Sequence, residues 1–228
     1  MPEPRGPGIR DRFRAQVREE AKQVALRQLA EGGPQALSVN AIGKKLGVSG
    51  PALYRYFASR DELLTELVID AYQDLSAALG AAVRRTRRQR PPQRLRALAA
   101  AYRSWANAQP HRYRLLFAAP LPGYDAHSAR LVAAAQEGMN ILLDVLTDVL
   151  PDPANPHPGP LDSQLAQWAE NRDIAGLSPV LARHAVTTWS RLHGMVSLEI
   201  EGNWASMGLD PELLFDAEVT AIVDAVTA

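Results

Sequence analysis

The sequence predicts an all-α protein, and two observations carry that prediction. Apolar residues recur at intervals of three and four along most of the chain, and no alternating pattern of useful length marks a β-strand. The chain has 228 residues, of which 46% are hydrophobic and 22% charged, as in ordinary folded proteins. A small amino-terminal helical domain followed by a larger helical bundle would account for this length.

Several classes of protein are excluded by composition. The chain has no cysteine, which excludes disulfide scaffolds, thiolate metal sites and cysteine nucleophiles. No apolar run reaches the ~20 residues that cross a bilayer, and no apolar stretch follows the first arginines as in a secretory signal. We therefore expect a cytoplasmic protein that has no contact with membranes.

The net charge of zero conceals a strong polarity along the chain. Residues 1–124 contain 21 Lys and Arg against 10 Asp and Glu, whereas residues 125–228 contain 4 against 15. Such a division favours contact between the amino-terminal half and a polyanion. The alternative is that a helical protein distributes its solvated charge unevenly.

The first helix is expected over 9–30. Its apolar residues run from Phe13 to Leu29 in steps of three and four, and Gly-Gly-Pro at 32–34 ends it. Residues 1–8 contain three prolines and two glycines, which predicts a disordered arm.

Two short helices are expected next, joined by a turn at Gly47. Ser38 is placed to cap the first and Ser49 the second, while Leu53 and Phe57 face inward at a spacing of four. This is a helix-turn-helix arrangement, in which the second helix enters the major groove of DNA. We assign 9–58 to a three-helix DNA-binding domain.

The remainder, 59–228, is expected to form the helical bundle. A capping box at 59–62 opens a long helix over 59–83. Five prolines at 151–160 predict a loop. The further helices are expected over 92–108, 110–118, 126–150, 178–203 and 210–226.

The second short helix has side chains suited to DNA. Tyr54 and Tyr56 supply hydroxyls for phosphates, and Arg55 is long enough to reach guanine O6 and N7. The amide of Gly50 lies at the helix amino terminus, and Arg60 opens the next helix, where it can touch the DNA backbone. The alternative is that the aromatic residues belong to the core and that Ser49 is only a cap.

These motifs resemble a known family. Residues 10–64 are similar to the amino-terminal domain of the TetR family of bacterial transcriptional repressors. The resemblance rests on Ala-Glu-Gly-Gly at 30–33, Leu-Ser-Val at 37–39, Leu-Gly-Val-Ser at 46–49, Leu-Tyr-Arg-Tyr-Phe at 53–57 and Ser-Arg-Asp-Glu-Leu at 59–63. Trp105, residues 110–117 and Trp-Ser-Arg-Leu-His-Gly at 189–194 resemble the subgroup named for its Trp-His-Gly motif.

The resemblance implies an all-helical homodimer that binds an operator in double-stranded DNA and encloses a small-molecule effector. The DNA contacts that it implies are Ser38, Ser49, Gly50, Pro51, Tyr54, Arg55, Tyr56 and Arg60. Pro51 lacks a backbone donor, so base recognition is expected to depend on Arg55 and the Gly50 amide. The dimer is expected to form through 178–203 and 210–226, which carry more apolar surface than one face needs.

Candidate effector contacts are aromatic, sulfur-bearing or histidine residues that could line a cavity. They are Trp105, Tyr113, Phe117, Met139, Trp168, Trp189 and His193. For each of them, the alternative is an ordinary core position. His184 and His193 lie nine residues apart with no acidic residue to complete a ligand set, so no metal site and no cofactor are expected.

An enzyme is not expected, because the nucleophile-elbow, phosphate-loop, dinucleotide and zinc-protease motifs are all missing. The sequence therefore predicts a DNA-binding regulator, and specifically a repressor that a small hydrophobic ligand releases from its operator. The alternative is a helical small-molecule-binding protein without DNA function.

Overall fold

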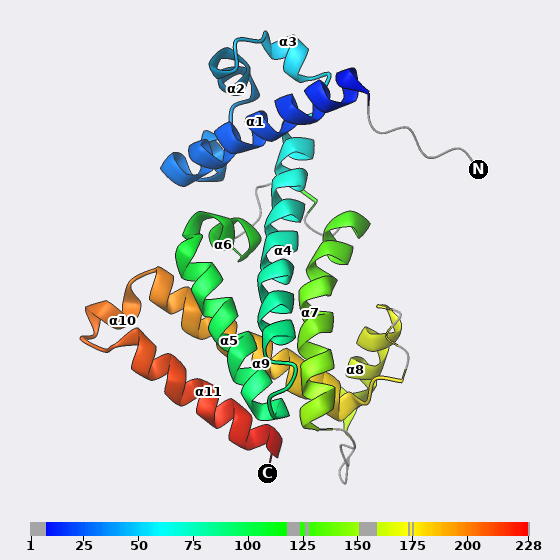
Figure 1. Ribbon diagram of the computed structural model, residues 1–228, viewed down its shortest axis with the longest axis vertical. Coiled ribbons are helices and arrows are strands. Elements are labelled where there is room, and N and C mark those ends of the chain that lie inside the picture. Colours follow the sequence, from blue (N-terminus) through cyan, green and yellow to red (C-terminus); the bar gives the residue numbers. More distant parts are fainter. Residues whose placement is uncertain are drawn as a thin grey trace. The chain divides into compact units, whose positions relative to one another are not determined.

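The structure, a computed structural model, is all-α as expected (Figure 1). It describes residues 8–117, 124–125, 128–150, 159–172, 174 and 176–227, and these contain helices but no strand. None of the helices in these ranges is both long enough and apolar enough to span a bilayer. The chain divides into two compact units, Met1–Ala71 with His111–Leu131 and Tyr72–Pro110 with Val132–Ala228.

The first unit is built on α1 (Ile9–Gly32), which packs against α2 (Val39–Lys45). A 3₁₀ turn, η1 (Pro34–Ala36), connects the two, and α3 (Gly50–Leu53) follows α2 (Figure 1). The first turns of α4 (Arg60–Arg85) complete the core. Its buried residues are Ala21, Val24, Ala25, Leu29, Leu37, Val39, Ile42, Leu53, Phe57, Leu63, Leu64 and Leu67.

The second domain was expected to begin at residue 59, and the boundary between the two units in the structure differs from this. The first turns of α4 bury apolar side chains in the core of the first unit, and so belong to that unit; these side chains are Leu63, Leu64 and Leu67. Leu115 of α6 (Pro110–Phe117) and Tyr124 also pack against this core. The first unit is therefore formed from two separate stretches of sequence.

The second unit contains the rest of α4, α5 (Pro91–Ala108), α7 (Ala129–Val149), α8 (Pro160–Glu170), α9 (Pro179–Ile200), α10 (Asn203–Ser206) and α11 (Pro211–Thr227). The helix α9 contacts α5, α8, α10 and α11, and α11 also packs on α5 (Figure 1). Each helix expected between 92 and 226 has a counterpart in one of the two units, with ends that differ by at most three residues; that of 110–118 is α6, in the first unit.

Two of these helices were not expected. The first, α8, begins directly after the proline-rich stretch, where Asp162 accepts a hydrogen bond from the Gly159 amide at 2.6 Å and pairs with Arg183 at 2.5 Å. The second, α10, is a single turn after Gly202, whose φ of 74° ends α9. Apart from Gly8 and residues 159–160, the expected arm over 1–8 and the expected loop over 151–160 lie outside the described residues.

One expectation for α1 is wrong. The apolar stripe that begins at Val17 is buried as predicted, but Phe13 is 63% exposed. The described part of the first unit places no core residue over Phe13, so the helix extends beyond its own core by more than one turn.

Candidate nucleic-acid interface

Two serine caps start the two short helices of the helix-turn-helix, as predicted. The Ser38 hydroxyl accepts a hydrogen bond from the Ala41 amide at 3.3 Å and starts α2. The Ser49 hydroxyl accepts one from the Ala52 amide at 3.2 Å and starts α3. Between the two helices, Gly47 has a φ of 69°, a conformation that side chains with a Cβ rarely adopt.

Close backbone approach fixes α3 against α2. A Cβ on Gly43 would lie 3.0 Å from the Val48 carbonyl oxygen and 3.4 Å from the Gly50 amide nitrogen. A Cβ on Gly50 would lie 2.3 Å from the Asn40 side-chain oxygen. Glycine is thus needed at Gly43, where the obstructing atoms are backbone, for the two helices to pack as closely as they do; at Gly50 the obstructing atom ends a flexible side chain that can turn away. Gly43 was not singled out from the sequence.

The helix α3, the second of the two short helices, is shorter than expected. It ends at Leu53, and the chain continues through a turn in which the Arg55 amide donates to Ala52 O and the Tyr56 amide to Leu53 O. Arg55 and Tyr56 therefore lie in the turn after the helix, not on it. We call residues 54–56 the recognition turn.

The sequence left two alternatives for the side chains of this segment, contact with DNA or a place in the core, and each alternative fits different side chains. Leu53 and Phe57 are fully buried, as their spacing predicted, whereas Tyr54 is 46% exposed. Tyr56 is half-buried and packs against the core. Ser49, Pro51 and Arg55 are exposed. Tyr54 and Arg55 are therefore the two large side chains of this segment that are most accessible to DNA.

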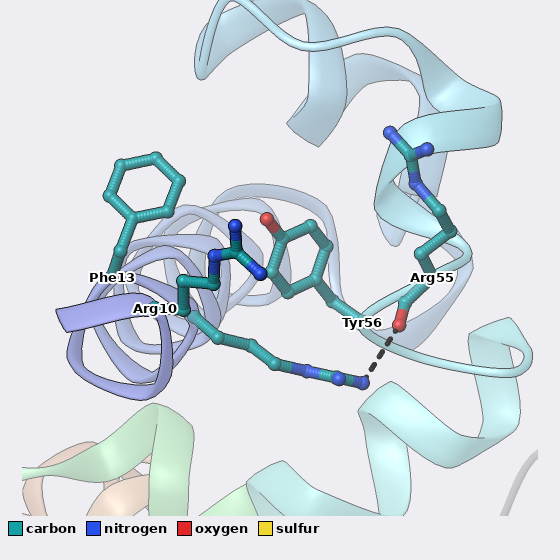
Figure 2. A pocket seen from close by; sticks show the side chains of 5 residues that line it. Arg10, Phe13, Arg55 and Tyr56 are labelled. Carbon is teal, nitrogen blue, oxygen red and sulfur yellow. Dashed lines mark hydrogen bonds between the residues drawn. The ribbon is translucent and has the colours of Figure 1, made fainter. Parts of the chain in front are cut away.

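Arginines of α1 bind the carbonyl groups of the recognition turn. Arg14 Nη2 donates to the Arg55 carbonyl at 3.2 Å (Figure 2), and Arg18 donates to the Tyr56 carbonyl. Arg18 also pairs with Glu66 of α4, and its guanidinium lies 4.6 Å from the centre of the Phe57 ring. These bonds connect α1, the recognition turn and α4.

Arg14 and Arg18 belong to a regular row that the sequence analysis missed. Arg10, Arg14, Arg18 and Lys22 occur at intervals of four, which places them on one face of α1; we call them the basic stripe. Lys22 lies 3.6 Å from Glu66 and 2.8 Å from Asp70. The spacing of these four cations was the sequence signal that could have identified them.

Arg60, expected to touch DNA, has a structural contact. Its Nε donates to the Leu37 carbonyl at 3.1 Å, which joins the start of α4 to the residue before the Ser38 cap. Nearby, Ser59 Oγ accepts from the Glu62 amide at 3.0 Å, but the Glu62 carboxylate pairs with Arg130 at 3.0 Å.

The candidate effector residues are divided between the two units. Tyr113 and Phe117 lie in the first unit, with ring centres 4.9 Å apart. In the second unit, Trp105 is buried and its indole N–H donates to Asp74 at 2.9 Å, while Met139 is half-buried on α7.

The remaining candidates lie nearer the surface of the second unit. Trp168 borders a shallow pocket of α8, and the Arg172 guanidinium lies 4.7 Å from its ring centre. Trp189 is 38% exposed and stacks on His193, with ring centres 5.5 Å apart. His193 Nδ1 lies 3.4 Å from the Tyr102 hydroxyl.

Neither histidine of α9 is placed in a metal site. Burial lowers the pKa of His193, and burial together with the Arg183 charge lowers the pKa of His184. Lowered values favour the neutral imidazoles at neutral pH. Within the described ranges, no group of three or more His, Asp or Glu side chains could hold a metal ion.

Sequence comparisons match both parts of the chain. The profile of bacterial regulatory proteins of the tetR family matches residues 23–67, and that of the tetracyclin repressor-like carboxy-terminal domain matches residues 95–222. The HTH-type transcriptional regulator Rv1816 of Mycobacterium tuberculosis is 33% identical over 224 residues, which cover 95% of this chain and 94% of the relative.

Solved structures are similar as well. The crystal structure described as that of a regulatory protein, SCO4313, is 39% identical with a TM-score of 0.77, and the match covers 94% of this chain and 98% of that one. The regulator FadR of Bacillus subtilis, solved in complex with stearoyl-CoA, is 15% identical with a TM-score of 0.54 over 90% and 97% of the two chains. A likeness at that identity shows the fold alone.

The close approach at Gly43 gives a stability prediction. We expect Gly43→Ala to lower the free energy of unfolding by ~1–3 kcal/mol, because the new methyl group meets backbone atoms that cannot move independently. The control is Gly80→Ala, whose Cβ would meet the movable end of Arg84 at 3.1 Å. The control should be neutral or stabilising by up to ~1 kcal/mol. Urea unfolding measures both, and equal stability of the two variants would contradict the packing role of Gly43.

Proposed function

We propose that this chain, which belongs to the TetR family of bacterial regulatory proteins, represses transcription by binding a DNA operator as a homodimer and leaves it when a small apolar effector binds. The observation that carries the DNA-binding part is the exposed recognition turn. Tyr54 and Arg55 project from a turn whose carbonyls are bonded to α1. We place the protein in the cytoplasm, where its operator would lie.

The DNA contacts that we propose are the exposed groups of the helix-turn-helix. Tyr54 would donate to a phosphate and Arg55 would read a base edge. The Gly50 amide would share base recognition with Arg55, and Ser38, Ser49 and Pro51 would border the DNA backbone. Tyr56 and Arg60 would contribute less to DNA binding than the sequence suggested. Tyr56 packs against the core, and Arg60 donates to the Leu37 carbonyl.

The homodimer would form through the exposed faces of α9 and α11. Much of the apolar surface that the sequence placed in this interface is buried within one chain, since α11 packs on α5 and α9. The large apolar side chains that remain exposed on the two helices are Trp189, Leu198 and Leu213, the last being 68% exposed. Trp189 thus fits the dimer interface better than a cavity. A two-fold pair could present its recognition turns about 34–36 Å apart, one turn of DNA.

The effector would bind in the second unit beside α5. Tyr102 and Trp105 lie three residues apart, on one face of α5, and each meets a polar partner, His193 and Asp74. Both aromatic side chains are buried. We infer an apolar effector with one hydrogen-bonding group. The stacked Trp189 and His193, followed by Gly194, support membership of the Trp-His-Gly subgroup.

Release of the operator would depend on α4, the helix that the two units share. Its first turns lie in the core of the first unit, and Leu75, Leu79 and Ala82 are buried farther along it. An effector can shift the protein away from the DNA-bound state only by its difference in affinity for the two states. A typical coupling of ~1–3 kcal/mol weakens operator binding ~5–150-fold.

Operator binding tests the recognition turn. Duplexes selected from a random library by the wild-type protein supply the operator, and fluorescence anisotropy measures affinity. Tyr54→Phe should weaken every duplex alike, by ~1 kcal/mol, because it removes one phosphate hydrogen bond. Arg55→Ala should cost ~1–3 kcal/mol on the operator and little on unrelated DNA. Equal losses on both duplexes would reject Arg55 as a base reader, and a library that yields no duplex would reject the proposed function.

Oligomeric state tests the interface. Leu213→Glu should convert the dimer to monomers in sedimentation at micromolar concentration, because a buried charge without a partner is costly. Leu213 is exposed in one chain, so folding should be unaffected. Leu161→Glu, at an exposed leucine of α8 outside the proposed interface, should remain dimeric. A wild-type protein that sediments as a monomer would contradict the dimer.

Effector response tests the site beside α5. A panel of apolar metabolites is screened by thermal shift, and each hit is tested for operator release. Trp105→Phe removes the indole N–H that meets Asp74 and should blunt release while leaving operator affinity largely intact. Trp168→Phe, at the shallow pocket of α8, should respond as wild type. A normal response by Trp105→Phe would place the effector elsewhere.

A further inference from the structure

A basic, aromatic pocket lies at the amino-terminal end of α1, beside the recognition turn (Figure 2). Its volume is about 500 Å³, and its lining consists of Arg10, Phe13, Arg14, Arg55 and Tyr56. Figure 2 shows Arg10 extending from α1 toward the Tyr56 ring and Phe13 extending from α1 apart from that ring. The described lining contains three guanidinium groups and no carboxylate, which is the charge that an anionic partner requires.

The basic stripe changes its environment along α1. Arg18 and Lys22 pair with Glu66 and Asp70, so α4 neutralises the half of the stripe farther from the amino terminus. Arg14 bonds to the Arg55 carbonyl, and among the described residues no carboxylate pairs with Arg10 or Arg14. The positive charge at the beginning of α1 is therefore left to act on another molecule.

Phe13 adds an apolar surface to this charge. It follows the spacing of the buried stripe of α1 but is 63% exposed, and with Tyr56 it gives the pocket two aromatic rings. A surface that combines guanidinium groups with apolar rings matches the sugar–phosphate backbone of DNA, whose charged phosphates alternate with the carbon faces of deoxyribose. The pocket is also continuous with the recognition turn, because Arg55 belongs to both.

We propose that the first two turns of α1 bind the DNA backbone that flanks each half-site, with Arg10 contacting a phosphate and Phe13 packing on a sugar. The proposal rests on the proposed function and deepens it, since it extends the operator beyond the base pairs that the recognition turn reaches. Arg14 is a positioning residue in this arrangement, because its guanidinium is bonded to the turn.

Trimming the DNA tests the flanking contact. The wild-type protein should bind the selected operator about tenfold more weakly when several base pairs are removed from each end, and Arg10→Ala should lose little on trimming. On the long duplex, Arg10→Ala should also reduce the slope of log affinity against log salt by about one for each subunit. Phe13→Ala should weaken binding to the long duplex about threefold and leave the salt slope unchanged.

Arg12→Ala is the matched control. Arg12 is an exposed arginine two residues from Arg10, so it lies on a different face of α1, and it does not line the pocket. It should retain the wild-type dependence on duplex length. Equal losses for Arg10→Ala and Arg12→Ala would show attraction without a defined contact and overturn the proposal.

Other outcomes separate this inference from the proposed function. If the wild-type protein binds long and trimmed operators equally, the flanking contact is wrong and the proposed function stands. If Phe13→Ala changes sedimentation and leaves DNA affinity unchanged, the face binds a second copy of the chain and the proposal is overturned. If no duplex binds at all, both the proposed function and this inference fail.

Discussion

The shape of the recognition turn depends on contacts from outside it, because a four-residue helix has too few internal hydrogen bonds to be stable alone. Leu53 and Phe57 bury their side chains in the core beneath it, and Gly43 lets α2 approach its backbone. Arg14 and Arg18 bind the carbonyls at its end. With these three restraints, exposed Tyr54 and Arg55 are displayed from a turn of fixed geometry, and the proposed interface is preorganised.

Local signals predicted most of the helices of this fold. Serine caps at Ser38 and Ser49 act on the next turn of backbone, so they can be read from a few residues. Apolar spacing identified Leu53 and Phe57 as core positions for the same reason. The residues of the helix-turn-helix were therefore located from the sequence, although their roles in DNA binding stay predictions.

The sequence could not supply what depends on distant partners. Phe13 continues the apolar spacing of α1, and only the extent of the core shows that it is left exposed by the part of the chain that the structure describes. The range 210–226 was expected to meet a partner subunit, but its Val219 and Ile222 are buried because α11 packs on α5 and α9 within the same chain. The α8 helix was overlooked because its short stretch, directly after the expected loop over 151–160, was assigned no element, and part of what stabilises its first turn is distant: Arg183 of α9 pairs with Asp162. The helix α3 ended earlier than expected because i→i+3 hydrogen bonds tighten the chain at Arg55.

The first unit is discontinuous in sequence, and this affects how the chain is made. Leu115 and Tyr124 pack against a core whose other members precede residue 68, and Tyr124 also lies within 3.1 Å of the Thr65 hydroxyl. During synthesis, Leu115 and Tyr124 can complete the amino-terminal core only after the segment from His111 to Leu131 has left the ribosome. A gene fusion that transplants only the first 71 residues would carry an unfinished core, with apolar surface facing water. Exchange of DNA specificity between such regulators has to include that later segment, or must replace its side chains with others that close the same gap.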